Sequence, residues 1–226
     1  MSDILVIAAH PDDEALGCGA TIARHAAAGE TVHILFVADG ETARPGTGDE
    51  DVSRREASAC EAARILGAGN PEFLRFPDNR LDGQVLLDIV AAIEKVVERH
   101  GPRIIYTHHG GDMNVDHRVV HQAVLTACRP LPGSSMDAIY AFEIPSSTEW
   151  GGSAFGPPFV PVHFVDVGGH VAKKRNALAA YSGEMRAFPH PRSAEAIDAL
   201  EKFRGAAAGV RAAEAFMLVR SVSRRD

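Results

Sequence analysis

Short apolar segments alternate with amphipathic segments along this chain, and this alternation restricts the possible folds more than any other feature. Runs typical of strands lie at 3–9, 31–38, 72–76, 103–107, 138–144, 161–167 and 215–222. Helical spacing is found between them at 15–28, 52–67, 84–100, 117–128 and 170–209, with an interruption at 189–191. Strands that alternate with helices predict an α/β fold, here a Rossmann-like, doubly wound, mostly parallel sheet with helices on both faces.

The length and composition of the chain suit one globular domain. The 226 residues contain no internal repeat, low-complexity tract or linker, so we expect a single domain over residues 1–226. The chain is 46% hydrophobic and 23% charged, which is ordinary for a soluble protein. Its formal net charge of −7 excludes nucleic acid and anionic membrane surfaces as main partners.

The sequence shows no segment for targeting or for membrane insertion. The N-terminus lacks a basic region and no apolar run reaches the length of a membrane helix, so we expect a cytoplasmic protein. The three cysteines, Cys18, Cys60 and Cys128, are far apart and odd in number. They predict neither a disulfide framework nor a thiolate zinc site, and each is expected to be a small buried residue on a helix.

The first strand leads directly into the stretch His10-Pro11-Asp12-Asp13-Glu14. In open α/β sheets, ligands bind at the carboxyl ends of the strands. His10 and Asp13 are three residues apart at the start of a helix, so their side chains can converge on one point. An imidazole and a carboxylate suit zinc or another divalent metal. Asp12 lies beside such a metal without having to bind it, where a general base is expected.

A second cluster, Asp116-His117, follows the strand predicted at 103–107. The carboxyl ends of parallel strands meet at one edge of the sheet, so His117 can face His10 and Asp13 and complete a three-residue ligand set. Either cluster alone also fits a helix cap, with one of its aspartates as the capping residue. Two clusters of complementary ligand types at two strand ends favour a metal site.

Three further patterns near these clusters are weaker. His121 shares the helix face of His117 and is a competing ligand. Arg118 stands where the zinc-protease motif H-E-x-x-H would have its glutamate, so that motif is absent. Gly17-Cys18-Gly19 does not continue as G-x-G-x-x-G, and the carboxylates before it would repel a pyrophosphate, so no nucleotide site is predicted.

The two clusters together resemble a known family. Ala9 to Glu14 and Asn114 to Arg118 are similar to the PIG-L/LmbE-like zinc-dependent N-deacetylases, which include the N-acetylglucosaminyl-phosphatidylinositol deacetylase. The resemblance covers most of the chain, with further similar stretches at Arg55 with Leu66-Gly67, 145–150, 189–193 and 213–216. It implies that His10, Asp13 and His117 are zinc ligands, that Asp12 is the general base, and that Arg55 lies near the site.

One position departs from the family pattern. Several members carry a histidine three residues before the last zinc ligand that helps to stabilise the oxyanion, and this chain has Asn114 there. Asn114 can donate a neutral hydrogen bond, and His108 or His109 can act from the same loop instead. These three alternatives remain open at this stage, and Asn114 and His109 are taken as the candidate catalytic donors beside Asp12.

The sequence therefore predicts a metal-dependent hydrolase that removes an N-acetyl group from an amino sugar or sugar conjugate, with Zn²⁺ or another divalent metal. Substrate contacts are expected from Arg55, Asp78 and Arg80, and also from Ser146-Ser147-Thr148. An apolar, alanine-rich tail at 205–219 suggests a homo-oligomer.

Two other functions remain open. One is an amidase acting on a thiol conjugate or another non-sugar amide. The other is a metal- or sugar-binding module without turnover. The carboxylate of Asp12 argues against the module, because a structural zinc site would be closed and would need no extra acid.

Overall fold

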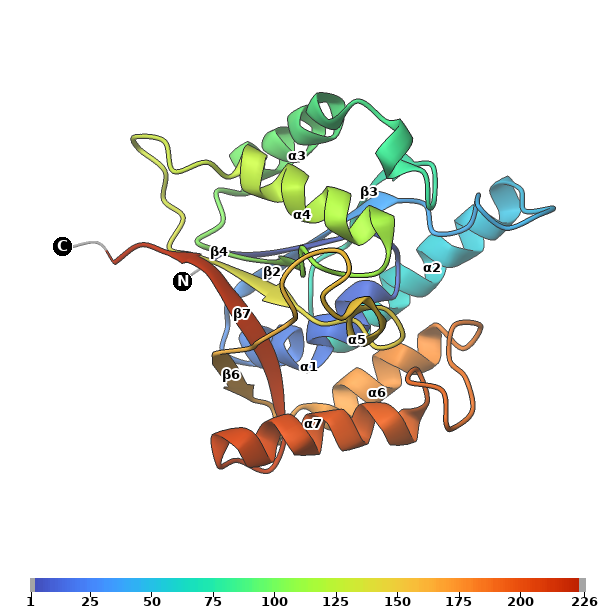
Figure 1. The fold of residues 1–226 in the computed structure, drawn as a ribbon, viewed down its shortest axis with the longest axis vertical. Coiled ribbons are helices and arrows are strands. Elements are labelled where there is room, and N and C mark those ends of the chain that lie inside the picture. Colours follow the sequence, from blue (N-terminus) through green and yellow to red (C-terminus); the bar gives the residue numbers. More distant parts are fainter. Residues whose placement is uncertain (1–2, 224–226) are drawn as a thin grey trace.

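The computed structural model describes residues 3–223 and has one sheet with helices on both faces (Figure 1). The strands are β1 Asp3–Ala8, β2 Thr31–Ala38, β3 Glu72–Phe76, β4 Ile104–His108, β5 Ala138–Phe142, β6 His163–Asp166 and β7 Ala213–Ser221. The helices are α1 Asp13–Ala27, α2 Asp49–Leu66, α3 Leu86–His100, α4 Val115–Ala127, α5 Thr148–Gly151, α6 Val171–Ala180 and α7 Ala194–Ala208, with a 3₁₀ turn, η1, at Leu81–Gly83.

The sheet has the strand order β3-β2-β1-β4-β5-β7-β6, which confirms the predicted doubly wound, mostly parallel architecture. Pairing is parallel from β3 to β5, whereas β7 runs antiparallel between β5 and β6. The order reverses between β1 and β4, which is the switch point where open α/β sheets bind ligands. The residues that follow β1 and β4 therefore meet at one crevice.

The central strands read as continuous apolar runs because both of their faces are buried. Ile4 and Val6 of β1 belong to the core beneath α1, α2, α6 and α7. Leu5 and Ile7 point the other way, into the core beneath α3 and α4. Figure 1 shows these two helical layers on opposite sides of the sheet.

Several helix boundaries differ from the sequence prediction for local reasons. Helix α2 begins at Asp49 rather than at residue 52, and the carboxylate of Asp51 accepts a 3.0 Å hydrogen bond from the Gly48 amide. Helix α4 is capped by Asn114, whose Oδ1 accepts from the Asp116 amide at 2.8 Å. Asp116 is therefore free of the capping role that its position had suggested.

The C-terminal third also adds detail to the prediction. The helical region at 170–209 is two helices, α6 and α7, joined by residues 181–193. Cys60 is exposed, contrary to the prediction, because it lies on the outer face of α2, whereas Cys18 and Cys128 are buried.

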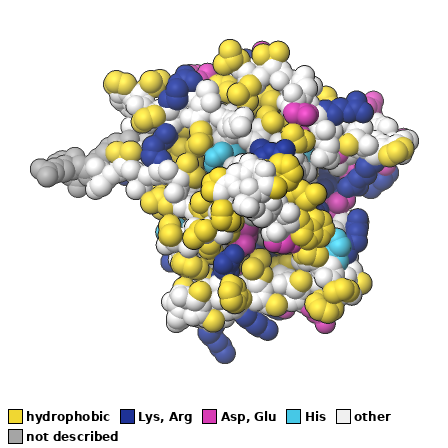
Figure 2. All heavy atoms as spheres, in the orientation of Figure 1, with side chains coloured by type: hydrophobic (Ala, Val, Ile, Leu, Met, Phe, Trp, Pro, Cys, Tyr) yellow, Lys and Arg dark blue, Asp and Glu magenta, His cyan; other side chains and the backbone are white. Residues whose placement is uncertain are grey.

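Apolar side chains gather over α5 and the loop beside it, where Trp150 and Phe155 are exposed (Figure 2). Among residues 3–223, no helix has the length and apolar character needed to cross a membrane.

Candidate active site

The three residues predicted as metal ligands lie together at the switch point. His10 and Asp13 come from the turn between β1 and α1, and His117 comes from the first turn of α4. Nδ1 of His10 and Nε2 of His117 each lie 3.3 Å from the same oxygen, Oδ2 of Asp13. All three side chains are buried, and one ligand atom from each lies within 4.8 Å of the others.

The hydrogen bonding of this group fits a metal ion. Within the described part of the chain, Oδ1 of Asp13 and both ring nitrogens of His117 are buried and have no hydrogen-bond partner. Buried polar atoms are rarely left in this state unless an ion or water completes them. Two imidazoles and one carboxylate are a donor set found in catalytic zinc sites, where a fourth position stays open.

The other nitrogen of each histidine faces a buried carboxylate. Nε2 of His10 lies 3.0 Å from Oδ2 of Asp116, and Nδ1 of His117 lies 3.1 Å from Oδ1 of Asp112. Metal-binding histidines usually direct their second nitrogen to such a partner, which orients the ring and determines its tautomer. The nearby carboxylates favour Nδ1 of His10 and Nε2 of His117, which both lie 3.3 Å from Oδ2 of Asp13, as the atoms that could bind a metal.

A second group, His10 with Asp78 and Asp116, is also close enough to hold a metal. Its oxygens, however, already have partners. Asp116 accepts hydrogen bonds from the amides of Asn79 at 2.7 Å and Leu81 at 3.0 Å, and Oδ1 of Asp78 accepts from the Asn79 side chain at 3.0 Å. The group with His117 is therefore the better metal site, because it holds the unpartnered atoms.

In both histidines at the end of β4, Nε2 is already engaged and cannot donate to His10, Asp13 or His117. The His108 ring stacks on His117, and its Nε2 accepts a 2.8 Å hydrogen bond from the Ala9 amide. Burial holds the pKa of His108 well below its usual value, so this ring is neutral. Nε2 of His109 lies 2.9 Å from the carbonyl oxygen of Pro157 and donates to it.

Asp12 stands between the ligand group and two arginines. Its Oδ2 lies 2.8 Å from Nη1 of Arg192 and 3.1 Å from Nη2 of Arg55. Burial raises the pKa of Asp12, and the two guanidinium groups oppose this shift. Its backbone adopts φ 135°, a strained conformation for a residue with a side chain. Glu14 holds this turn by accepting a 3.1 Å hydrogen bond from the Asp12 amide.

Arg192 is a site residue that the sequence alone did not single out, although it lies in the family-like stretch at 189–193. It reaches Asp12 from the connection between α6 and α7, and its Nε donates a 2.8 Å hydrogen bond to Ser146. Asp112 was also missed. The hydroxyls of Ser147 and Thr148 donate to its carboxylate, so these side chains support the metal group.

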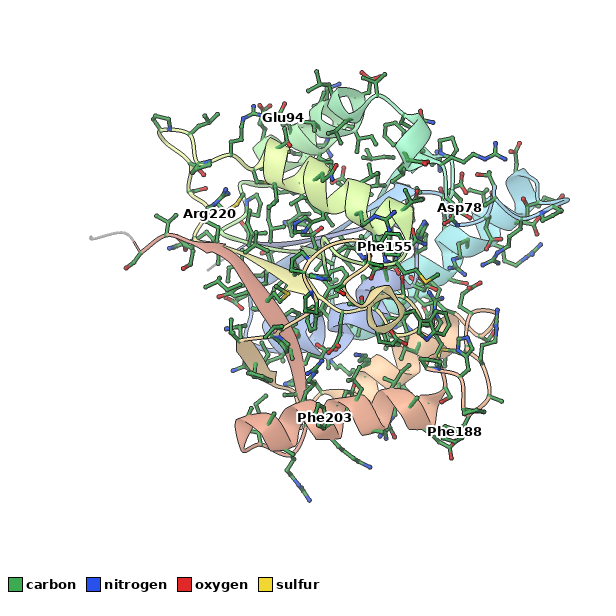
Figure 3. The ribbon with its side chains drawn as sticks, viewed as in Figure 1. Asp78, Glu94, Phe155, Phe188, Phe203 and Arg220 are labelled. Carbon is green, nitrogen blue, oxygen red and sulfur yellow. The ribbon has the colours of Figure 1, made fainter. Side chains whose placement is uncertain are left out.

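A cavity of about 170 Å³ opens beside His10 and Asp12. It is lined by His10, Asp12, Gly40, Ala43, Arg44, Arg55, Asp78, Asn79, Asn114, Glu184 and Arg192. The structure therefore brings Asn114 to one cavity with Arg55 and Asp78, two of the predicted substrate contacts, and Figure 3 marks Asp78 in the loop after β3. Arg80 is exposed and lies outside this lining, and the predicted contacts Ser146-Ser147-Thr148 lie outside it as well.

The geometry agrees with comparisons to known proteins. Residues 5–128, more than half of the chain, match the PIG-L family, described as GlcNAc-PI de-N-acetylase. An uncharacterized deacetylase, YaiS, of Escherichia coli K12 is 36% identical over 149 residues, which is 64% of this chain and 75% of YaiS. The 1D-myo-inositol 2-acetamido-2-deoxy-alpha-D-glucopyranoside deacetylase of Rhodococcus opacus is 29% identical, with 82% of each chain covered.

The chain therefore belongs to the PIG-L family of deacetylases. The same fold is found in a 4-carboxy-2-hydroxymuconate hydratase of Pseudomonas putida, with a TM-score of 0.79, 24% identity, and coverage of 100% of this chain and 99% of that one. A likeness at this level shows the fold alone. Because one fold serves different reactions, the reaction has to be argued from the site.

Proposed function

We propose that this protein is a zinc-dependent deacetylase that hydrolyses the acetamide of an amino sugar or sugar conjugate. The observation that carries the proposal is the buried ligand group with unpartnered atoms, next to a carboxylate that does not belong to it. The Rhodococcus relative, named for a 2-acetamido-glucopyranoside substrate, supports this substrate class.

His10, Asp13 and His117 would hold the metal. A zinc ion in such a site supplies Lewis-acid activation of a carbonyl group and lowers the pKa of a water molecule to about 7. The contribution of this chain is to orient the two rings through Asp116 and Asp112, and to place His10 in the wall of the cavity.

Asp12 is placed to move the proton. Both guanidinium contacts are made with its Oδ2, so Oδ1 is the oxygen that accepts a proton from the attacking water. The same oxygen then returns the proton to the amine as the C–N bond breaks, which yields acetate and the free amine. Arg55 and Arg192 hold the carboxylate in place during both transfers.

Asn114 is the better placed of the candidate oxyanion donors. Its Nδ2 donates to Oδ1 of Asn79 at 3.2 Å, which uses one of the two amide hydrogens and leaves the other for the cavity. His109 has its Nε2 engaged by the carbonyl of Pro157, and Nε2 of His108 is an acceptor. A donor aimed at the developing oxyanion stabilises the transition state more than the substrate.

The substrate is expected to bind through polar contacts, because most of the cavity lining is charged or amide-bearing. Asp78 and Asn79 offer an acceptor and a donor for sugar hydroxyls. Arg55 is committed to Asp12 and to Glu184, at 3.1 and 2.6 Å, so its main contribution is to the charge balance of the site. Arg80 stays a predicted contact at the outer surface.

Removal of the metal tests this function directly. We expect a chelator to abolish acetate release from N-acetylglucosamine conjugates, and added Zn²⁺ to restore it. A protein that binds zinc but never releases acetate would be the binding module. Faster hydrolysis of non-sugar amides in a substrate panel would instead favour the alternative amidase.

Arg192→Ala is expected to lower kcat by about 10- to 100-fold, because a hydrogen bond to a charged group contributes about 1.5–3 kcal/mol. The change leaves Asp12 with Arg55 alone. Steady-state kinetics on the zinc-loaded protein measure the loss, and added guanidinium should restore part of it. Arg175→Ala, which breaks an exposed pair with Asp198, is the control and should stay within about twofold of wild type. Full activity of Arg192→Ala would contradict the role.

A further inference from the structure

Helix α1 is broken at Cys18, five residues after it begins. Cys18 has φ −148° and ψ 24°, which are not helical values, so α1 consists of two helical pieces joined at this point. The first piece, residues 13–17, directly follows Asp12 and carries Asp13. The break is buried on all sides, so the backbone groups that it frees cannot be satisfied by bulk water.

Glu214 of β7 satisfies the amides that begin the second piece. Its Oε1 accepts from the Ala20 amide at 3.1 Å, and its Oε2 accepts from the Thr21 amide at 2.6 Å. A carboxylate at this position is also favoured by the positive end of the helix dipole. Glu214 is thus an N-terminal cap supplied from a strand almost 200 residues away in the sequence.

Lys174 of α6 satisfies the end of the first piece. Its ammonium donates to the carbonyl of Leu16 at 3.0 Å and to Oε1 of Glu214 at 2.7 Å. Burial disfavours the charge, but Glu214 and Glu201 outweigh it and raise the pKa of Lys174 above its usual value. One buried ion pair therefore connects both sides of the break.

The two glycines beside Cys18 make room for this arrangement. A Cβ on Gly17 would lie 2.5 Å from the ring of Phe142, and one on Gly19 would lie 3.2 Å from Cγ of Lys174. The stretch Gly17-Cys18-Gly19, which resembled an incomplete nucleotide motif, is thus explained by close packing around the break.

We propose that Glu214 and Lys174 are positioning residues for the candidate metal centre. They determine the place of the first piece of α1, and hence of Asp13 relative to His117 on α4. Tyr181, just after α6, also holds the first piece of α1, because its hydroxyl donates a 2.7 Å hydrogen bond to Glu14. All three residues lie beyond the segment matched to the family, so the C-terminal third supplies this support. The inference rests on the proposed function in taking Asp13 as a metal ligand.

Zinc affinity and amide exchange test the proposal without an activity assay. Glu214→Ala is expected to weaken zinc binding by about tenfold, measured by competition with a chelator, which is the lower end of the roughly 10- to 100-fold lost with a partner that contacts a ligand directly. In the metal-free protein, hydrogen exchange should become faster over residues 12–18. Glu214→Gln keeps an acceptor oxygen for the two amides and should recover most of the affinity.

Glu201→Gln is the matched control. Glu201 lies 3.3 Å from the same ammonium and is equally buried, but it makes no hydrogen bond to α1. It should leave zinc affinity and exchange at 12–18 within about twofold of wild type, whatever it does to stability. If Glu214→Ala does not fold, Lys174→Met takes its place, because methionine keeps an unbranched stem over Gly19. Weaker zinc binding and faster exchange are expected for this variant too.

Two results would overturn the proposal: wild-type zinc affinity and exchange in the folded positioning variants, or an equal loss in Glu201→Gln. Failure of the proposed function looks different, because the wild-type protein would then bind no zinc. In that case the exchange measurement on the metal-free protein still decides whether Glu214 positions the first piece of α1.

Discussion

Asp12→Asn is expected to lower kcat for acetate release by about 10²- to 10⁴-fold, the usual contribution of a positioned general base. The amide has nearly the same shape as the carboxylate but cannot accept the proton of the attacking water. Because Asp12 is outside the ligand group, the zinc content should stay at the wild-type level. Kinetics and metal analysis on the same preparation measure both quantities.

The control for this substitution is Glu184→Gln. Glu184 lines the same cavity and contacts Arg55 at 2.6 Å, so the change removes a charge from the cavity without removing the proposed base. We expect a loss of less than about tenfold, in line with one lost charged contact. Undiminished turnover in zinc-loaded Asp12→Asn, or an equal loss in both variants, would reject Asp12 as the base.

His117→Ala is expected to have the second large effect, loss of both zinc binding and turnover. It removes one of three ligands, so the affinity should fall by more than the roughly 10- to 100-fold that loss of an outer partner costs. Asp112→Asn is expected to show that smaller loss of affinity, because it removes the negative charge that lies 3.1 Å from Nδ1 of His117. Zinc titration of the three proteins should therefore rank wild type first, Asp112→Asn second and His117→Ala last.

His121→Gln is the control for this series. His121 shares the helix face of His117, but its Nδ1 lies 2.8 Å from the carbonyl oxygen of His108. We therefore expect that His121 does not bind the metal. Zinc affinity close to wild type is expected. If His121→Gln lost zinc while His117→Ala kept it, the ligand set would have to include the competing histidine instead.

The sequence was a good guide to the central sheet and a weaker guide to its surroundings. Strands buried on both faces are mostly apolar, so β1, β2 and β4 stand out in the sequence. Helix ends depend on single side-chain contacts, such as Asp51 to Gly48, and these have no periodic signal. The predicted apolar tail is partly accounted for, because residues 212–216 are buried within this chain, and the homo-oligomer stays a prediction.

The candidate site was predictable where chemistry and spacing coincide in the sequence. His10, Asp12 and Asp13 lie in one short turn, and a parallel sheet requires the turn with His117 to lie at the same edge. Arg192 gave no such signal, because it approaches Asp12 from a connection that is distant in sequence and irregular in conformation. The sequence could not favour one oxyanion donor among Asn114, His108 and His109, because that depends on which ring nitrogens already have partners.

By itself, the sequence determined the class of fold, the edge of the sheet that carries the chemistry, and the residue types gathered there. These follow from local periodicity and from the fixed geometry of parallel strands. The tertiary structure alone decided which nitrogen of each histidine lies beside Asp13, which arginines hold Asp12, and how Glu214 and Lys174 connect the two pieces of α1. Such contacts join residues far apart in the chain, and their directions arise only when the layers have packed.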